Sequence, residues 1–196
     1  MKKKIAVFDF DNTLTTKDSF VDLIIYTFGK KVYFRLLKLT PIFICFKLGI
    51  LSRQISKEKM FSMFFKGKTN SEFNNICNEY VNKRIQKIIN YKTLNKLKMH
   101  QQNGDIVIIL SASLENWLKI WADKNKIDNV ISTKCEIVNE VVTGKFATGN
   151  CYGQEKVNRF RAFYGDENQY YIYMYGDSRG DKEMLEIANE KFYRKV

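Results

Sequence analysis

Short apolar runs alternate along the chain with segments whose apolar positions recur every three or four residues. The runs at 5–10 and 106–110 are mostly aliphatic or aromatic, the first ending at acidic residues and the second at a serine. Runs of this length are typical of strands buried on both faces of a parallel sheet. By the same pattern we expect further strands at 130–133, 170–175 and 192–196.

Helical spacing dominates the chain between residue 18 and about residue 100, with turn signals at Gly29, Gly49, Gly67 and Asn70-Ser71. The remaining expected elements are helices at 114–122, 154–164 and 182–188 and a hairpin with strands at 136–142 and 144–148. Strands that alternate with helices predict an α/β fold with a parallel sheet. The helical stretch after the first strand is too long for a simple crossover, so we interpret it as an inserted cap. The predicted domains are a core of residues 1–16 and 101–196 and a helical cap of residues 17–100.

The positive charge of the chain is concentrated in one segment. The 196 residues include 33 Lys and Arg against 21 Asp and Glu, a net charge of +12. Residues 23–70 alone carry ten basic residues and one acid, Glu58, for a net +9. Such a surface favours nucleic acid, an anionic membrane or a phosphorylated small molecule as partner.

A nucleic-acid partner is not expected. The chain has no zinc module, helix-turn-helix signature or glycine/aromatic RNA motif. The acids at the strand ends would also repel phosphates unless a metal were bound. A nucleic-acid-binding or membrane-binding module without catalysis remains the alternative of another class.

Residues 33–51 combine bulky apolar side chains with interspersed basic ones. The longest uncharged piece, 39–46, is well short of the ~20 residues that a membrane-spanning helix needs. Two interpretations of residues 33–51 remain. The segment is either the buried core of the cap, with its lysines reaching outward, or a surface that contacts an anionic membrane. The four cysteines form no C-x-x-C pair, and Asp9 and Asp11 interrupt the apolar start. We therefore expect a cytoplasmic protein, and the second interpretation would place it peripherally at the inner face of the membrane.

Candidate chemistry follows the first two predicted strands. Asp9 and Asp11 are two residues apart where the chain leaves the first strand, so both can face a pocket at the carboxyl edge of the sheet. Ser111 ends the second strand, where its hydroxyl can donate to an anion or cap the next helix. Ser113 is the more natural cap, because the helical pattern starts just after it.

Two further features lie later in the chain. Lys156 can neutralise an anion, and Asp177 and Asp181 can hold a hard cation such as Mg²⁺. Singly, each feature also has an ordinary explanation as a turn, a cap or a solvated lysine. Together they supply the nucleophile, the proton donor and the positive charge that cleavage of a phosphate monoester requires.

In these residues the chain resembles the haloacid dehalogenase (HAD) superfamily, in its phosphoserine-phosphatase-like branch. Residues 9–15 match the first motif, D-x-D-x-T, Ser111 the second, Lys156 the third and residues 176–181 the fourth. The four motifs occur in order and cover nearly the whole chain. The resemblance implies a Rossmann-like parallel sheet with an inserted α-helical cap.

The resemblance also implies a Mg²⁺-dependent phosphomonoester hydrolase. Asp9 would be the nucleophile that forms an aspartyl-phosphate, and Asp11 the general acid and base. The remaining roles would be phosphate binding by Ser111, Lys156, Asn12, Thr13 and Ala112, and Mg²⁺ binding by Asp9, the backbone carbonyl of Asp11, Asp177 and Asp181. Thr13 would also steady its loop.

The resemblance leaves two substrate classes open. Asp18 lies where phosphoserine phosphatases have a carboxylate for the substrate's ammonium group, so phosphoserine or another small amino-alcohol phosphate is one alternative. Against phosphoserine, the second motif reads Ser-Ala-Ser in place of Ser-Gly-Gly, and the cap arginine motif has no counterpart. The basic apolar cap and the Cys-x-Gly-x-x-Lys motif at 151–156 resemble bacterial phosphatidylglycerophosphatase members of this branch. A lipid phosphate such as phosphatidylglycerophosphate is therefore the first predicted substrate.

Overall fold

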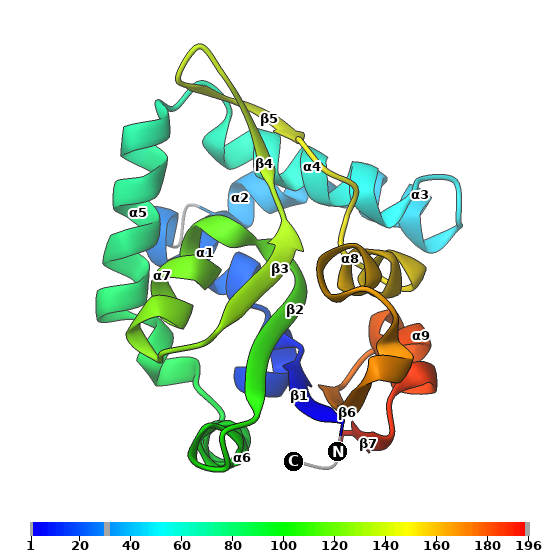
Figure 1. Cartoon of the computed structure of the whole chain (residues 1–196). Coiled ribbons are helices and arrows are strands. Elements are labelled where there is room, and N and C mark those ends of the chain that lie inside the picture. The colour runs from blue at the N-terminus through cyan, green and yellow to red at the C-terminus, as the bar shows by residue number, and fades with distance from the viewer. Residues whose placement is uncertain (1, 30–31, 195–196) are drawn as a thin grey trace.

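Five parallel strands form the central sheet of the molecule (Figure 1). The computed structural model describes residues 2–29 and 32–194 and orders the strands β3-β2-β1-β6-β7. The strands are β1 (Lys3–Phe8), β2 (Ile106–Leu114), β3 (Asn129–Thr133), β6 (Tyr170–Gly176) and β7 (Glu190–Tyr193). The predicted α/β fold with a Rossmann-like parallel sheet is confirmed.

β1 lies at the centre because it is apolar on both faces. Ala6 and Phe8 pack into one hydrophobic cluster, and Ile5 and Val7 into another on the opposite face. Two helices cover each face, α6 (Tyr91–Gln102) and α7 (Glu115–Lys124) on the first and α8 (Gln154–Tyr164) and α9 (Lys182–Ile187) on the second (Figure 1). The carboxyl ends of the strands stay open at one edge.

The last strand differs from its prediction. β7 begins at Glu190, two residues before the expected start, and ends at Tyr193, while residues 195–196 lie outside the described part of the chain. It pairs with β6 up to the partners Gly176 and Tyr193, where β6 itself ends. Arg194 then takes a left-handed φ of 52°, which ends the pairing.

The chain between β1 and α6 forms the helical cap. Its helices are α1 (Ser19–Phe28), α2 (Val32–Leu37), α3 (Thr40–Lys47), α4 (Arg53–Phe65) and α5 (Asn70–Lys83). Fully buried phenylalanines hold it together: the ring of Phe61 lies 5.4 Å from that of Phe65 and 5.5 Å from that of Phe73. The chain enters and leaves the cap side by side, because Thr15 and Ile89 form an antiparallel bridge.

The predicted cap boundary at residue 100 places α6 in the cap. In the structure α6 packs against β1 and β2, and its Leu94 and Leu97 belong to the hydrophobic cluster under the sheet. We therefore propose that the cap ends near Asn90 and that α6 belongs to the core.

A hairpin of β4 (Cys135–Val138) and β5 (Val141–Phe146) rises from the core beside α4 (Figure 1). The hairpin was predicted, but its turn was placed three to four residues too late. The turn is at Asn139 and Glu140, whose φ values of 49° and 59° are those that a tight two-residue hairpin turn requires.

The hairpin and the loop after it tie the cap to the core. The Phe146 N–H donates to Glu58 Oε1 at 3.0 Å, and the Asn150 N–H donates to Gln54 Oε1 at 3.2 Å. Val141 also forms an antiparallel bridge with Thr69, next to α5. These bonds hold α4 over the open edge of the sheet.

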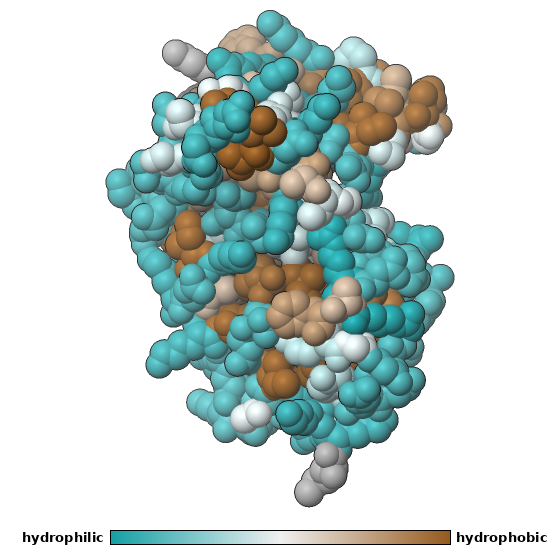
Figure 2. Space-filling model, turned by 45° about the horizontal axis from the view of Figure 1, so that its top comes forward, coloured by the Kyte–Doolittle hydropathy of each residue, from teal (hydrophilic) through white to brown (hydrophobic). Residues whose placement is uncertain are grey.

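Among the side chains of residues 33–51 that the structure describes, six large apolar ones are exposed. They are Tyr33 (57%), Phe34 (77%), Leu37 (67%), Ile44 (52%), Leu48 (69%) and Ile50 (69%). For these side chains the interpretation as buried core of the cap is wrong. Figure 2 shows apolar residues gathered at the upper right of the molecule, in the region of α3. In the described part of the chain, no helix has the length and apolar character needed to cross a membrane.

Candidate active site

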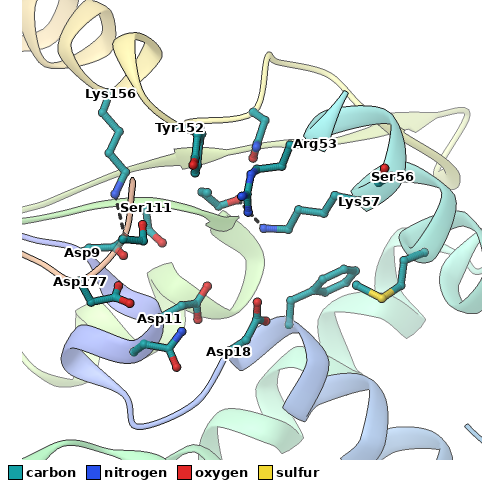
Figure 3. Close-up of a pocket in the computed structure, with 16 residues that line it drawn as sticks. Asp9, Asp11, Asp18, Arg53, Ser56, Lys57, Ser111, Tyr152, Lys156 and Asp177 are labelled. Carbon is teal, nitrogen blue, oxygen red and sulfur yellow. Dashed lines mark hydrogen bonds and ion pairs between the residues drawn. The ribbon is translucent and has the colours of Figure 1, made fainter. Parts of the chain in front are cut away.

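The loop after β1 presents Asp9 and Asp11 to a cavity at the carboxyl edge of the sheet (Figure 3). The Asp9 N–H donates to the Tyr175 carbonyl at 2.9 Å, so the loop starts in register with β6. Asn12 has a left-handed φ of 56°, which turns the chain directly after the second carboxylate. The two aspartates therefore line one cavity, as the sequence predicts.

Lys156 lies in the first turn of α8 and is fully buried beneath this loop. Its Nζ donates to Asp9 Oδ1 at 2.9 Å and to Asp181 Oδ1 at 2.5 Å. The second oxygen of Asp181 accepts bonds from the Asp177 N–H, the Ser178 N–H and the Ser178 hydroxyl. Asp181 has no exposed surface, so it acts on the cavity through Lys156 and the Asp177 loop.

Asp11 is held by two donors. Oδ1 accepts the Ser19 N–H at 2.8 Å, and Oδ2 accepts the Ser113 hydroxyl at 2.5 Å. The prediction that Ser113 caps the following helix is wrong, because β2 continues to Leu114, and Leu114 itself is the N-cap of α7, without a side-chain cap bond. The end of β2 thus delivers Ser113 to Asp11.

Ser111 and Ala112 line the same cavity. The Ser111 hydroxyl accepts the Ser113 N–H at 3.2 Å, so it is oriented within the strand end and does not cap a helix. Asn12 also lines the cavity, whereas Thr13 is buried outside it and donates to Asp177 Oδ1 at 3.5 Å. The position of Thr13 suits the steadying role that the resemblance implies.

Three carboxylates come close enough to share a cation. Among residues 2–29 and 32–194, Asp9, Asp177 and Asp181 each offer one oxygen, and these oxygens lie within 4.8 Å of one another. Of the three, Asp9 and Asp177 line the cavity.

Burial dominates the electrostatics of the acids. It raises the pKa of Asp9 to about 7, with Asp181 and Asp11 adding to the rise and Lys156 opposing it. Burial also raises the pKa of Asp11, helped by Asp18, while Lys57 and the Ser113 hydroxyl oppose the rise. The pKa of Lys156 is raised although burial lowers it, because Asp9 and Asp181 outweigh the burial. The Lys156 ammonium therefore stays charged.

The cavity has a volume of about 240 Å³ and continues from the aspartates to the cap. Asp18 lies on its wall, exposed, and caps α1 by accepting the Val21 N–H at 3.0 Å. Arg53 and Lys57 of α4 also line the cavity, and no sequence motif singles them out. Their four-residue spacing places them on one face of the helix, but in a lysine-rich segment that spacing alone does not show which face meets the site.

A parallel sheet with paired carboxylates after its central strand and a helical cap inserted behind them defines a class of capped α/β hydrolases. The chain belongs to the family of haloacid dehalogenase-like hydrolases, whose model matches residues 6–186. The resemblance inferred from the four motifs is therefore confirmed, and the chain is an enzyme of this family.

Relatives and solved structures agree with this assignment. Protein CicA of Caulobacter vibrioides (strain NA1000 / CB15N) is 30% identical over 193 residues, which are 97% of this chain and 85% of that protein. A protein of unknown function from Bordetella pertussis Tohama I has a TM-score of 0.81 at 20% identity, over 95% of this chain and 87% of the other. A phospho-aspartyl intermediate analogue of phosphoserine phosphatase has a TM-score of 0.64 at 18% identity, over 97% of this chain and 86% of the other. The two solved structures show that the fold is shared.

Proposed function

We propose that the chain hydrolyses phosphate monoesters through an aspartyl-phosphate on Asp9. The observation that carries the proposal is the 2.9 Å contact between Asp9 and the buried Lys156, in a cavity that Asp11 also lines. A carboxylate nucleophile beside a fixed cation and a second carboxyl group meets the needs of attack on phosphorus. The structural likeness to a phospho-aspartyl analogue of phosphoserine phosphatase supports the same chemistry.

In the first step the Asp9 carboxylate attacks phosphorus, and the bond from phosphorus to the ester oxygen breaks. Protonated Asp11 gives its proton to the departing oxygen. In the second step Asp11 takes a proton from water, whose oxygen attacks phosphorus, releasing phosphate and restoring Asp9. Burial favours the protonated form of Asp11 and the bonds from Ser113 and Ser19 favour the ionised form, so both forms are within reach.

The phosphoryl oxygens need positive charge and donors. Lys156 Nζ lies beside Asp9, and Ser111 lines the same cavity. We assign the non-bridging oxygens to these two groups, with Asn12 and Ala112 lining the same cavity.

A divalent metal ion fits the donor set. Carboxylate and carbonyl oxygens are the ligands that Mg²⁺ prefers, and a cation offsets the repulsion among the buried Asp9, Asp177 and Asp181. We propose that Asp9, the Asp11 carbonyl and Asp177 hold Mg²⁺, and that Asp181, whose oxygens are already engaged, positions Lys156 and the loop. When bound, Mg²⁺ neutralises charge on the phosphoryl group.

A lipid phosphate is the substrate class that the surface of the cap favours. The exposed apolar side chains of residues 33–51, with Lys38 and Lys47 exposed among them, make a surface suited to the interface of an anionic membrane. The cavity of about 240 Å³ accommodates a head group and leaves acyl chains outside. A small amino-alcohol phosphate is the alternative, supported by the same volume and by Asp18 on the wall.

Vesicle sedimentation tests the membrane contact. We expect the protein to sediment with anionic vesicles at low salt, and Phe34→Ser to lower the bound fraction about fivefold, because Phe34 is 77% exposed and offers its ring to the interface. Phe163→Ser is the matched control, since Phe163 is 59% exposed on α8 in the core. Equal binding of both variants and the wild type, or no sedimentation at all, contradicts the lipid proposal.

A substrate screen tests the reaction itself. Phosphate release with Mg²⁺ is measured for phosphoserine, phosphocholine, sugar phosphates, nucleotides and phosphatidylglycerophosphate, each repeated with EDTA. We expect Mg²⁺-dependent release that EDTA abolishes. Binding of nucleic acid without any release would support the non-catalytic alternative.

A further inference from the structure

Tyr152 forms part of the cavity wall and has no part in the proposed hydrolytic steps. It lies in the loop just before α8, and its side chain points into the cavity (Figure 3). Within residues 2–29 and 32–194, its hydroxyl makes no hydrogen bond to another residue. A tyrosine hydroxyl is a neutral hydrogen-bond donor, so this one can donate to a ligand in the cavity.

The ring of Tyr152 is held between the core and the cap. On the core side it packs directly on Gly180, where an added Cβ would lie 2.3 Å from Tyr152 Cε2 and 3.1 Å from Tyr152 Cζ. The Gly153 N–H donates to the Gly180 carbonyl at 2.9 Å, which joins the backbones of the two loops. On the cap side, the Arg53 guanidinium lies 4.4 Å from the ring centre. The ring is therefore in place before a substrate arrives, which reduces the entropic cost of binding.

The contact with Gly180 also locates the hydroxyl. Cζ is the ring carbon that carries the hydroxyl, so its closeness to Gly180 places the hydroxyl at the loop of residues 177–181. This loop carries Asp177, which lines the cavity together with Lys156 and Ser111. The hydroxyl thus lies on the side of the cavity that would receive the phosphoryl group.

The absence of a side chain at residue 180 serves this contact. Gly180 does not have a positive φ, so its backbone conformation is open to other residues. Any larger residue would collide with the ring of Tyr152. Glycine at this position therefore allows the ring to approach the loop.

We propose that the Tyr152 hydroxyl donates a hydrogen bond to a non-bridging oxygen of the phosphoryl group, and that Gly180 is required to place it there. The inference rests on the proposed phosphatase function and adds a third donor to Lys156 and Ser111. Charge builds on the phosphoryl oxygens during the reaction, and a fixed donor stabilises it. The proton stays on Tyr152 throughout, so the hydroxyl binds the phosphoryl group without exchanging a proton with it.

Tyr152→Phe tests the hydroxyl, because it keeps the ring and removes only the donor. We expect kcat/KM to fall about tenfold for p-nitrophenyl phosphate and for the best substrate of the screen alike, since the phosphoryl group is common to both. Inorganic phosphate carries the same oxygens without a leaving group, so its constant for competitive inhibition should rise by a similar factor. Tyr171→Phe is the matched control: it removes a hydroxyl that donates to Glu190, away from the cavity, and leaves both quantities unchanged.

Gly180→Ala tests the placement of the ring. The added methyl group displaces the ring of Tyr152, so we expect kcat/KM to fall about tenfold in the wild-type background. In the Tyr152→Phe background the loss should be at most about twofold, because the displaced ring has no hydroxyl to lose. Gly149→Ala is the matched control, since a Cβ there lies no closer than 3.7 Å to its nearest neighbour, Glu155. Thermal melts verify that each variant folds.

Wild-type kcat/KM and wild-type inhibition by phosphate in Tyr152→Phe would overturn the inference and leave the phosphatase function intact. A loss confined to one substrate, with phosphate inhibition unchanged, also overturns it, because the hydroxyl then contacts the leaving group. Equal losses from Gly180→Ala in both backgrounds overturn the role of Gly180. If the wild type releases no phosphate even from p-nitrophenyl phosphate, the proposed function itself is contradicted, and the inference with it.

Discussion

Asp9 and Asp11 are two residues apart, yet their partners differ. Asp9 contacts the Lys156 ammonium, whereas Asp11 accepts bonds from the neutral groups of Ser19 and Ser113. A nucleophile needs its charge, and a proton donor needs to be able to lose it. The neighbours of each carboxylate therefore suit the role proposed for it.

Ser113→Ala tests the tuning of Asp11. The Ser113 hydroxyl lowers the pKa of Asp11, so its removal raises that pKa further. Because the first step uses protonated Asp11, we expect the basic limb of the kcat–pH profile to move to higher pH and kcat to fall about tenfold. The control is Ser132→Ala, since Ser132 is buried outside the cavity and its hydroxyl has no partner among the described residues. An unmoved basic limb in Ser113→Ala would show that this bond does not set the pKa.

The raised pKa of Asp9 predicts a pH-dependent stability of the metal-free protein. With a folded pKa of about 7 against an ordinary value of 3.8, folded Asp9 binds more protons than unfolded Asp9 between these pH values. The contribution of Asp9 to the free energy of unfolding is therefore fully present below pH 3.8 and is lost as the pH rises through 7. The amide introduced by Asp9→Asn does not titrate, so in EDTA the melting temperature of this variant should exceed that of the wild type by a margin that grows from pH 5 to pH 8. A constant margin would be incompatible with the raised pKa.

The positions of the candidate residues at the strand ends were predictable residue by residue, but the contacts across the cavity were not. Asp9, Ser111 and Asp177 follow apolar runs, and parallel strands place such positions at one edge. Ser113 was misassigned because a serine just before a helix is a cap signature, and only the extension of β2 shows otherwise. Arg53 was missed because its place at the cavity depends on how the cap packs over the core.

Among the elements, α4 and the β4–β5 hairpin fix the position of the cap relative to the core. Gly144 of β5 has a φ of 87°, and a Cβ at this position would lie 2.7 Å from Ser62 Cβ on α4. Only glycine allows the hairpin and the helix to approach so closely. The hairpin itself was predictable from its sequence pattern. Its contact with α4 was not, because the two segments are about 80 residues apart in the chain and no local sequence pattern indicates that they meet.

Gly144→Ala measures this contact. Gly165→Ala is the matched control, because Gly165 has a φ of 81° and open space around it. Both variants incur the cost of an alanine at a positive φ, about 1–3 kcal/mol. Gly144→Ala adds the overpacking against Ser62, about 1–3 kcal/mol, in the free energy of unfolding measured with urea. Equal losses in the two variants would mean that the hairpin and α4 do not pack closely.

At the scale of the whole molecule, charge and chemistry lie in different parts of the chain. The cap segment 23–70 carries net +9 of the total +12, while the paired aspartates lie in the core. The parallel sheet and the inserted cap were predictable from the alternation of apolar runs with helical spacing, because these patterns indicate which positions are buried. The packing of α6 against the sheet was not predictable, because the helical pattern of α6 is the same whether the helix covers the core or belongs to the cap.

The proposed reaction requires Asp9 to be the nucleophile of a Mg²⁺-dependent phosphomonoesterase. The most direct measurement is phosphate release by the wild type and by Asp9→Asn, with Mg²⁺ and with EDTA, on the best substrate of the screen. We expect Mg²⁺-dependent release by the wild type and a loss of more than about a thousandfold in Asp9→Asn, which keeps its fold. Release by Asp9→Asn at the wild-type rate, or release by the wild type that EDTA leaves unchanged, would contradict it.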